Sequence, residues 1–296
     1  MPERHATPEA CSRREALDDW LAGTDGLVLG LDFDGTLAPI VEDHAEAAMT
    51  TESRAAVDRL AEHSGVGLAA VSGRALEDLT GRVGLDGVVY AGNHGLELGY
   101  DGERTVHPAV EGVGPAIDRL CAELDERLGD VPGYAVENKR VTATVHFRTV
   151  PEEHVPRVVG TVEEVVDGAD GLRVSEGREI REVRPAVEWD KGRVMELLAA
   201  TAPDGWRVMY VGDDTTDEDA FRAIQPDGVG VHVASSEHGD VETDADYRLD
   251  GQAAVPSFLE WLDESVPRPD SSRGDRWPAG ETFDPDRLSD PDGSGS

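Results

Sequence analysis

The sequence predicts an α/β fold in which helices cover a doubly wound, mostly parallel sheet, with a small α+β module inserted into the chain. Apolar runs without helical period occur at residues 27–29, 66–71 and 207–211, which is typical of strands buried on both faces. Helical patterns follow these runs, and such strand–helix–strand units build parallel sheets. Within residues 108–185, strands that alternate apolar and polar residues predict a separate sheet with one exposed face.

The net charge limits the classes of partner. The 296 residues carry 62 acidic and 27 basic side chains, a formal net charge of −35, and the acids are spread along the whole chain. At molar salt the Debye length is about 3 Å and repulsion is screened, so we expect adaptation to a salty cytoplasm. An acidic surface for a basic partner is the alternative, but it predicts clustering that the sequence hardly shows. Nucleic-acid binding is disfavoured.

Nothing in the sequence predicts attachment to a membrane. No apolar run approaches the ~18 residues of a spanning helix, and residues 1–14 contain no apolar signal segment. Cys11 and Cys121 are too few for a disulfide framework and have no metal-binding spacing. We therefore expect a cytoplasmic protein, and a monomer.

The chain divides into five predicted segments. A loose tail at residues 1–14 precedes the first part of the core at 15–107. The α+β module occupies residues 108–185, and the second part of the core covers 186–263. Residues 264–296 are rich in Pro, Gly, Ser and Asp without periodicity, so we expect a disordered acidic tail.

Helices and strands alternate through the first part of the core. Apolar residues recur at helical spacing in its helices, and a threonine is placed to cap the second of them. The expected elements are a helix at 15–21, a strand at 27–29, a helix at 51–62, a strand at 66–71, a helix at 75–79, a strand at 88–91 and a hairpin over 96–107.

The module consists of two successive helix–strand–strand units, and the core then resumes. The expected module elements are at 117–128, 133–137, 141–148, 155–166, 172–175 and 179–183. In the second core part we expect a helix from 190, strands at 207–211, 228–233 and 245–249, and a final helix at 252–262.

Two carboxylates follow the first strand, in the stretch Asp32-Phe33-Asp34-Gly35-Thr36. If the strand continues, both side chains point the same way; a turn started by Gly35 would instead aim one side chain and one carbonyl at a common point. Paired acids beside backbone amides suit a hard divalent cation held against a phosphate. An acidic turn without chemistry is the alternative for this motif alone.

Two further strand ends carry candidates for anion binding. Ligands bind at the carboxyl ends of parallel strands, so Ser72 is placed to offer a hydroxyl and amides to an anion, and Arg74 a guanidinium fork. A plain helix N-cap is the alternative for Ser72. Asn93 and His94, between glycines after the third strand, predict a loop that faces a ligand.

Lysine use singles out two positions. Lys139 and Lys191 are the only lysines among the 27 basic residues, which suggests that a compact ammonium is required at each; codon bias is the alternative. We expect Lys191 to begin a helix, where the macrodipole disfavours a cation unless an anion or a carboxylate cluster lies nearby.

Five acids occur within the seven residues 213–219, directly after a predicted strand. Such a cluster repels itself unless a cation neutralises part of it. An acidic helix start explains two or three of these residues but not Asp213, which lies on the strand side.

Together these features resemble the haloacid dehalogenase superfamily of phosphatases. The signature DxDGT is present at residues 32–36, and the second-motif serine, third-motif lysine and GDxxxD acids follow in order as Ser72, Lys191 and Asp213 with Asp217. Further motifs narrow the resemblance to the trehalose-6-phosphate phosphatases over residues 27–262. They are Val71-Ser72-Gly73-Arg74, Gly92-Asn93-His94-Gly95-Leu96-Glu97, Val136-Glu137-Asn138-Lys139, His146-Phe147-Arg148, Glu182-Val183-Arg184-Pro185, Lys191-Gly192 and the stretch from Gly212 to Asp219.

The resemblance implies a Mg²⁺-dependent phosphatase of the haloacid dehalogenase type. Asp32 would be the nucleophile that forms an aspartyl-phosphate, and Asp34 the general acid and base. Ser72 and Lys191 would hold phosphoryl oxygens. The residues that would hold Mg²⁺ are Asp32, Asp34 through its carbonyl, Asp213, and either Asp217 or Asp214, directly or through water.

The implied substrate is a small sugar phosphate, trehalose 6-phosphate, on which the module would close as a lid. The residues expected to contact it are Gly73, Arg74, Asn93, His94, Glu137, Lys139, Arg148, Arg178 and Glu182. At Arg178 the sequence departs from the family, which often has a lysine there; the charge is kept, but the contact geometry to a sugar differs.

Three other interpretations are compatible with the sequence. A related phosphatase for sucrose phosphate or a mannosyl-glycerate phosphate would share the same core. A catalytically inactive sensor would bind a sugar phosphate without hydrolysing it. A mutase would keep the phosphoenzyme and release an isomeric sugar phosphate.

Overall fold

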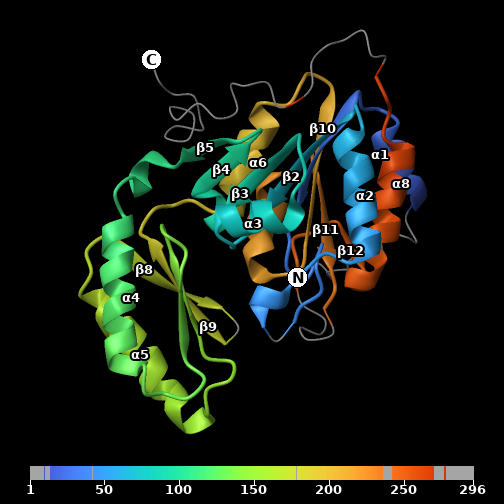
Figure 1. Ribbon diagram of the computed structural model, residues 1–296. Helices are drawn as coiled ribbons and strands as arrows, with labels where there is room; N and C mark the ends of the chain where they lie inside the picture. Colours follow the sequence, from blue (N-terminus) through green and yellow to red (C-terminus); the bar gives the residue numbers. More distant parts are fainter. Residues whose placement is uncertain are drawn as a thin grey trace, which may run out of the picture. The chain divides into compact units, whose positions relative to one another are not determined.

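The computed structural model describes residues 10, 14–41, 43–177, 179–235, 242–269 and 277 (Figure 1). Contacts within the chain divide it into two compact units. Unit 1 comprises residues 1–105 and 189–296, and unit 2 comprises residues 106–188.

Unit 1 is built on a sheet of eight strands. In spatial order these are β12 (Tyr247–Leu249), β11 (Val229–Val233), β10 (Trp206–Gly212), β1 (Gly26–Leu31), β2 (Val66–Val71), β3 (Val88–Gly92), β4 (Glu97–Tyr100) and β5 (Glu103–Val106). The strands from β12 to β3 pair in parallel, and β4 pairs antiparallel with β3. The predicted α/β class with a mostly parallel sheet is confirmed.

Helices of unit 1 pack on this sheet because its central strands are apolar on both faces. All six residues of β1 are buried, and Leu27, Leu29 and Leu31 belong to one hydrophobic core cluster. Figure 1 shows α2 beside α8. The helices are α1 (Arg14–Leu21), α2 (Thr51–Glu62), α3 (Leu76–Val83), α6 (Lys191–Ala200), α7 (Glu218–Ala223) and α8 (Val255–Ser265).

The helix starts differ in how they are capped. Thr50 caps α2, since its Oγ1 accepts the Ser53 amide at 3.0 Å. The N-cap of α3 is Ala75, without a side-chain hydrogen bond. Ser72 Oγ instead accepts the Arg74 amide at 3.2 Å, so Ser72 stabilises the turn before α3 and does not cap the helix.

Unit 2 is a four-stranded antiparallel sheet with two helices on one face. The strand order is β6 (Ala135–Asn138), β7 (Ala143–His146), β9 (Ile180–Pro185) and β8 (Leu172–Gly177). Helices α4 (Gly114–Leu128) and α5 (Val155–Asp167) cover the apolar face. Ala143, Val145 and Val183 are fully buried there, because side chains of a strand alternate between its two faces.

Part of each predicted tail is described. The Ala10 amide donates to Arg248 O at 2.7 Å. Trp277 is buried, and its Nε1 donates to Thr201 Oγ1 at 3.3 Å. The remaining residues of the predicted tails, apart from 14 and 264–269, lie outside the described residues. Within the described part of the chain, no helix is both long and apolar enough to span a membrane.

Candidate active site

Neighbouring strand ends bring the predicted acids together. β1 and β10 pair in parallel with Leu31 beside Val211, so the residues that follow them leave the same edge of the sheet. The Asp32 amide donates to Val211 O at 2.9 Å. Asp32 and Asp213 thus come from adjacent strands, and both are about 4% exposed.

Lys191 joins this cluster from the first turn of α6. Asp190 caps the helix by accepting the Arg193 amide at 3.0 Å. The Lys191 Nζ donates to Asp32 Oδ1 and to Asp217 Oδ1, both at 2.7 Å. Burial acts to lower the pKa of Lys191, but the carboxylates of Asp217 and Asp32 outweigh it and raise the pKa well above its usual value. The lysine therefore stays charged.

Asp217 is held by four hydrogen bonds. Its Oδ1 accepts from Lys191 Nζ and from the Tyr210 hydroxyl, the latter at 2.7 Å. Its Oδ2 accepts the amides of Asp213 and Asp214, both at 2.9 Å. Asp217 consequently organises the cluster from a fully buried position. Sequence reasoning missed Tyr210, although a buried tyrosine in an apolar strand usually finds a hydrogen-bond partner.

Among the described residues, the buried Oδ1 of Asp213 has no hydrogen-bond partner. Asp32, Asp213 and Asp217 each offer an oxygen, and these atoms lie within 4.8 Å of one another. Burial and the neighbouring Asp32 raise the pKa of Asp213 to about 9. Burial also raises the pKa of Asp32 to about 8, although Lys191 opposes this shift. A buried, unpartnered oxygen among crowded acids fits a divalent cation.

Asp214 lies at the rim of the cluster. It is exposed, and its Oδ1 accepts the Thr215 amide at 2.7 Å, which caps the short helix at residues 215–217. Together with Asp217 it forms a reciprocal capping box. Its capping role accounts for part of the acid density that the sequence shows.

The turn after β1 fits tightly around the acids. Gly35 has φ of +83°, and a Cβ there would collide with the Asp213 carboxylate. Asp34 lies in the same turn, and Arg74 binds its carboxylate with two hydrogen bonds of 2.7 Å. Arg74, which we expected to meet a phosphate, is therefore engaged with a carboxylate.

The loops after β2 and β3 are joined by backbone hydrogen bonds. The Asn93 amide donates to Arg74 O at 2.7 Å and the His94 amide to Ser72 O at 2.9 Å. Asn93 and His94 both adopt left-handed φ, 50° and 57°. A Cβ on Gly73 would lie 2.7 Å from His94 Nε2, so only glycine allows this approach.

Glu97 supports this loop and was missed in the sequence as a site residue. It is 1% exposed, and its Oε2 accepts from Asn93 Nδ2 at 2.7 Å and from the Leu76 amide at 3.3 Å. Arg104 pairs with its other oxygen. The available signal was an acid three residues after His94 on a predicted strand.

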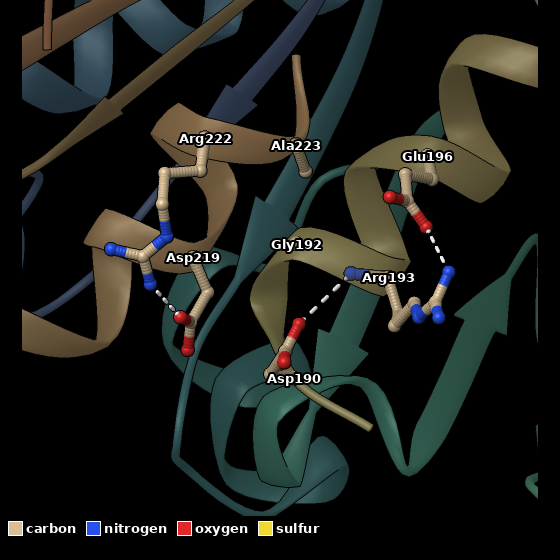
Figure 2. A pocket seen from close by; sticks show the side chains of 7 residues that line it. All are labelled: Asp190, Gly192, Arg193, Glu196, Asp219, Arg222 and Ala223. Carbon is tan, nitrogen blue, oxygen red and sulfur yellow. Dashed lines mark hydrogen bonds and ion pairs between the residues drawn. The ribbon is translucent and has the colours of Figure 1, made fainter. Parts of the chain in front are cut away.

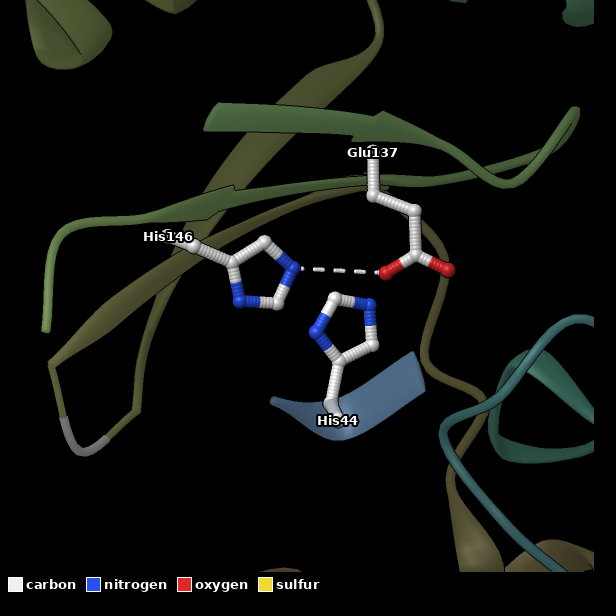
Figure 3. A group of neighbouring side chains, drawn as sticks. All are labelled: His44, Glu137 and His146. Atoms are coloured by element: carbon white, nitrogen blue, oxygen red, sulfur yellow. Dashed lines mark hydrogen bonds and ion pairs between the residues drawn. The ribbon is translucent and has the colours of Figure 1, made fainter. Parts of the chain in front are cut away.

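In unit 2, the predicted sugar contacts lie on the polar face of the sheet. Register places Glu137 beside Thr144 and Thr144 beside Glu182, so the three side chains share one face. Lys139 Nζ lies 3.9 Å from Glu182 Oε1. Figure 3 shows Glu137 facing His146, whose Nε2 is 3.3 Å from Glu137 Oε2.

Arg148 and Arg178 are the other two predicted contacts of unit 2. Arg148 Nε donates to Glu179 Oε2 at 2.9 Å, and the two side chains are 33% and 47% exposed. Arg178 lies outside the described residues.

A separate cavity of about 310 Å³ lies in unit 1 between α6 and α7. Figure 2 shows its lining residues, Asp190, Gly192, Arg193, Glu196, Asp219, Arg222 and Ala223. Arg193 pairs with Glu196 and Arg222 with Asp219. None of the predicted site residues lines this cavity.

Comparison with known proteins agrees with the fold and the motifs. The C-terminal domain of trehalose-6-phosphate phosphatase from Candida albicans matches with a TM-score of 0.71 at 22% identity, over 88% of this chain and 99% of that chain. A phosphatase of the haloalkanoate (HAD) enzyme superfamily from Bacteroides thetaiotaomicron matches with a TM-score of 0.50 at 20% identity, over 81% and 95% of the two chains. At these identities both matches show a shared fold, the α/β architecture of these solved phosphatases.

Sequence similarity gives the family. The trehalose-phosphatase family model matches residues 30–253. The trehalose-phosphate phosphatase of Mycobacterium marinum is 40% identical over 232 residues, which cover 77% of this chain and 59% of that relative. The chain thus spans less than two thirds of the length of this relative. It belongs to the trehalose-phosphatase family.

Proposed function

We propose that this chain hydrolyses trehalose 6-phosphate to trehalose and inorganic phosphate through an aspartyl-phosphate on Asp32. The observation that carries the proposal is the buried cluster in which Lys191 Nζ bridges Asp32 and Asp217 at 2.7 Å, beside the unpartnered oxygen of Asp213. The substrate is inferred from the name of the 40% identical relative and from the family model.

Asp32 attacks the phosphorus, and the bond from phosphorus to the sugar oxygen breaks. Lys191 holds the Asp32 carboxylate in place and, with Ser72, binds phosphoryl oxygens, so that negative charge is stabilised as it develops. Asp34 gives a proton to the leaving sugar oxygen. Water then attacks the phosphorus, Asp34 takes its proton, and Asp32 is released with inorganic phosphate.

Mg²⁺ fits the acids of this site. Asp32, Asp213 and the carbonyl of Asp34 would hold it, with Asp217 or Asp214 contributing directly or through water. When bound, the ion neutralises the crowded carboxylates and screens the phosphoryl oxygens from them. Burial and neighbouring acids raise the pKa values of Asp32 and Asp213, and a cation bound between the two carboxylates would offset both effects, which supports this proposal.

We assign recognition of sugar hydroxyls to the polar face of unit 2. Glu137, Lys139 and Glu182 combine acceptors and donors on one sheet face, and such groups reject ligands that leave them unpaired. We also propose that the excess of acidic residues adapts the protein to a salty cytoplasm, since its repulsion is screened at molar salt.

The test is phosphate release at molar KCl with Mg²⁺, from trehalose 6-phosphate, sucrose 6-phosphate and glucose 6-phosphate in parallel. We expect strong preference for trehalose 6-phosphate, and no release by Asp32→Asn. Comparable rates on all three substrates would keep the phosphatase chemistry and reject the substrate assignment. An active Asp32→Asn would reject the mechanism.

A further inference from the structure

Arg74 makes a bidentate ion pair with Asp34. Its Nε donates to Asp34 Oδ2 and its Nη2 to Asp34 Oδ1, both at 2.7 Å. Two parallel charge-assisted bonds fix the carboxylate in position and in orientation, which a single bond does not. The Arg74 side chain is 7% exposed and that of Asp34 is 42% exposed.

The guanidinium is itself anchored from behind. Its Nη1 donates to Asp78 Oδ2 of α3 at 2.7 Å, and its Nη2 also donates to His44 O at 2.7 Å. Its Cζ lies 5.3 Å from the centroid of the Phe33 ring. Arg82, one turn further along α3, donates to both oxygens of Asp78. Arg74 is therefore a rigid support. The single hydrogen on its Nε is already donated to Asp34 and is not available to a phosphate.

The pair leaves Asp34 able to react. A carboxylate has about four lone-pair sites, and the fork of Arg74 occupies one on each oxygen. Because the Asp34 side chain is 42% exposed, sites beyond the two that Arg74 occupies remain accessible. Asp34 is thus held as an oriented carboxylate that can accept one further proton.

We propose that Arg74 is a positioning residue that aims the Asp34 carboxylate at the water which hydrolyses the aspartyl-phosphate. The inference rests on the proposed function, because it assigns a part in the second half of that reaction. In this step the water oxygen bonds to phosphorus, and the bond from phosphorus to Asp32 breaks with its electron pair returning to Asp32. One water proton passes to Asp34.

This role has a kinetic signature. With 4-nitrophenyl phosphate the leaving group needs no proton, so formation of the phosphoenzyme does not depend on Asp34. The value of kcat/KM covers the steps up to phosphoryl transfer, whereas kcat includes hydrolysis of the intermediate. Loss of the Arg74 fork should therefore lower kcat and KM together. Damage to the fold would instead reduce the active fraction and leave KM unchanged.

The experiment measures steady-state and stopped-flow release of 4-nitrophenolate by the full chain with Mg²⁺ at molar KCl. For Arg74→Met we expect kcat to fall by ~10²-fold, the scale of one acid–base group, with kcat/KM changed by less than ~10-fold and a burst approaching one 4-nitrophenolate per enzyme. Arg74→Lys keeps the charge but not the fork, and should show the same split more weakly.

Controls separate this inference from the proposed function. Asp34→Asn should show the same split, and combining it with Arg74→Met should add little because both remove one unit. Arg54→Met is the matched control: Arg54 contacts Asp58 and Val83 O instead of the site, and its variant should keep wild-type kinetics.

The outcomes are distinct. If Asp34→Asn shows the split and both Arg74 variants have wild-type kcat, or lose kcat and kcat/KM equally without a burst, the role of Arg74 is refuted while the proposed function stands. If the wild-type chain releases no phosphate from trehalose 6-phosphate yet shows the split with 4-nitrophenyl phosphate, the substrate is refuted and the role of Arg74 stands.

Discussion

Replacing Asp213 by asparagine should stabilise the metal-free protein and remove its response to Mg²⁺. Burial and the neighbouring Asp32 raise the pKa of Asp213 from 3.8 to about 9. At pH 8 the folded, metal-free protein therefore binds a proton at Asp213, and the unfolded chain does not. A raised carboxyl pKa favours the folded state below the unfolded value and loses that contribution as pH rises toward 9.

The size of the effect follows from the shift. The pKa of 3.8 in the unfolded chain lies about 4 units below pH 8, and each unit corresponds to about 1.4 kcal/mol. Keeping Asp213 protonated in the folded protein at pH 8 therefore lowers the free energy of unfolding by at most on the order of 6 kcal/mol. Asparagine avoids this cost. Its buried amide lacks a full set of hydrogen-bond partners, however, and this offsets about 1–3 kcal/mol of the stabilisation. Since 1 kcal/mol moves Tm by about 2–4 °C in a domain of 150–250 residues, the remaining gain of at most about 3–5 kcal/mol corresponds to a rise of at most about 6–20 °C.

The assay is thermal unfolding at pH 8 in molar KCl, with EDTA or with Mg²⁺. Wild type should gain about 2.7 kcal/mol from Mg²⁺ at 100 times its Kd, and Asp213→Asn should gain far less. Asp227→Asn is the matched control, since Asp227 is an exposed acid outside the cluster, and it should behave as wild type. An Asp213→Asn protein with an unchanged or lower metal-free Tm, or with a wild-type response to Mg²⁺, would refute the reasoning.

Three further changes probe the other parts of the site. Lys191→Met leaves two buried carboxylates without their cation, so we expect a loss of about 3–5 kcal/mol of stability without metal and at least ~10³-fold in kcat, measured by thermal unfolding and phosphate release; a loss confined to KM would contradict this. Tyr210→Phe removes a hydrogen bond to the charged Asp217, and unfolding in denaturant should show about 1.5–3 kcal/mol lower stability; an unchanged midpoint would show that the hydroxyl contributes nothing. Glu137→Gln and Glu182→Gln should reduce kcat/KM for trehalose 6-phosphate by at least ~10-fold and spare 4-nitrophenyl phosphate; equal losses on both substrates would remove these residues from sugar recognition.

The sequence was most informative where strands end in polar residues. Apolar runs without helical period predicted β1, β2 and β10, and the positions of Asp32 and Asp213 directly after two of these runs placed both acids at strand ends. The helix macrodipole predicted that Lys191 needs acids beside it, and the structure places two there at 2.7 Å. These inferences depend on local pattern and general physics.

Side-chain partners across the fold were not predictable in the same way. Arg74 was expected to bind phosphate, but which acceptor a guanidinium finds depends on how the turn after β1 lies against α3, and no local pattern contains that. In the sequence, Tyr210 looks like one more buried residue of an apolar strand. Its hydrogen bond to Asp217 depends on the shape of the turn between them, which the sequence does not predict. Thr144 was placed between Glu137 and Glu182 only by strand register.

The most direct test of the account is to identify the residue that carries phosphate during turnover. The full chain is mixed with ³²P-labelled trehalose 6-phosphate and Mg²⁺ at molar KCl, quenched in acid within milliseconds, and reduced with borohydride, which converts an aspartyl-phosphate to homoserine. We predict protein-bound label before reduction and homoserine at position 32 in the peptide map, with neither in Asp32→Asn. Turnover without protein-bound label, or modification at another residue, would contradict the central claim that Asp32 in the buried cluster is the nucleophile.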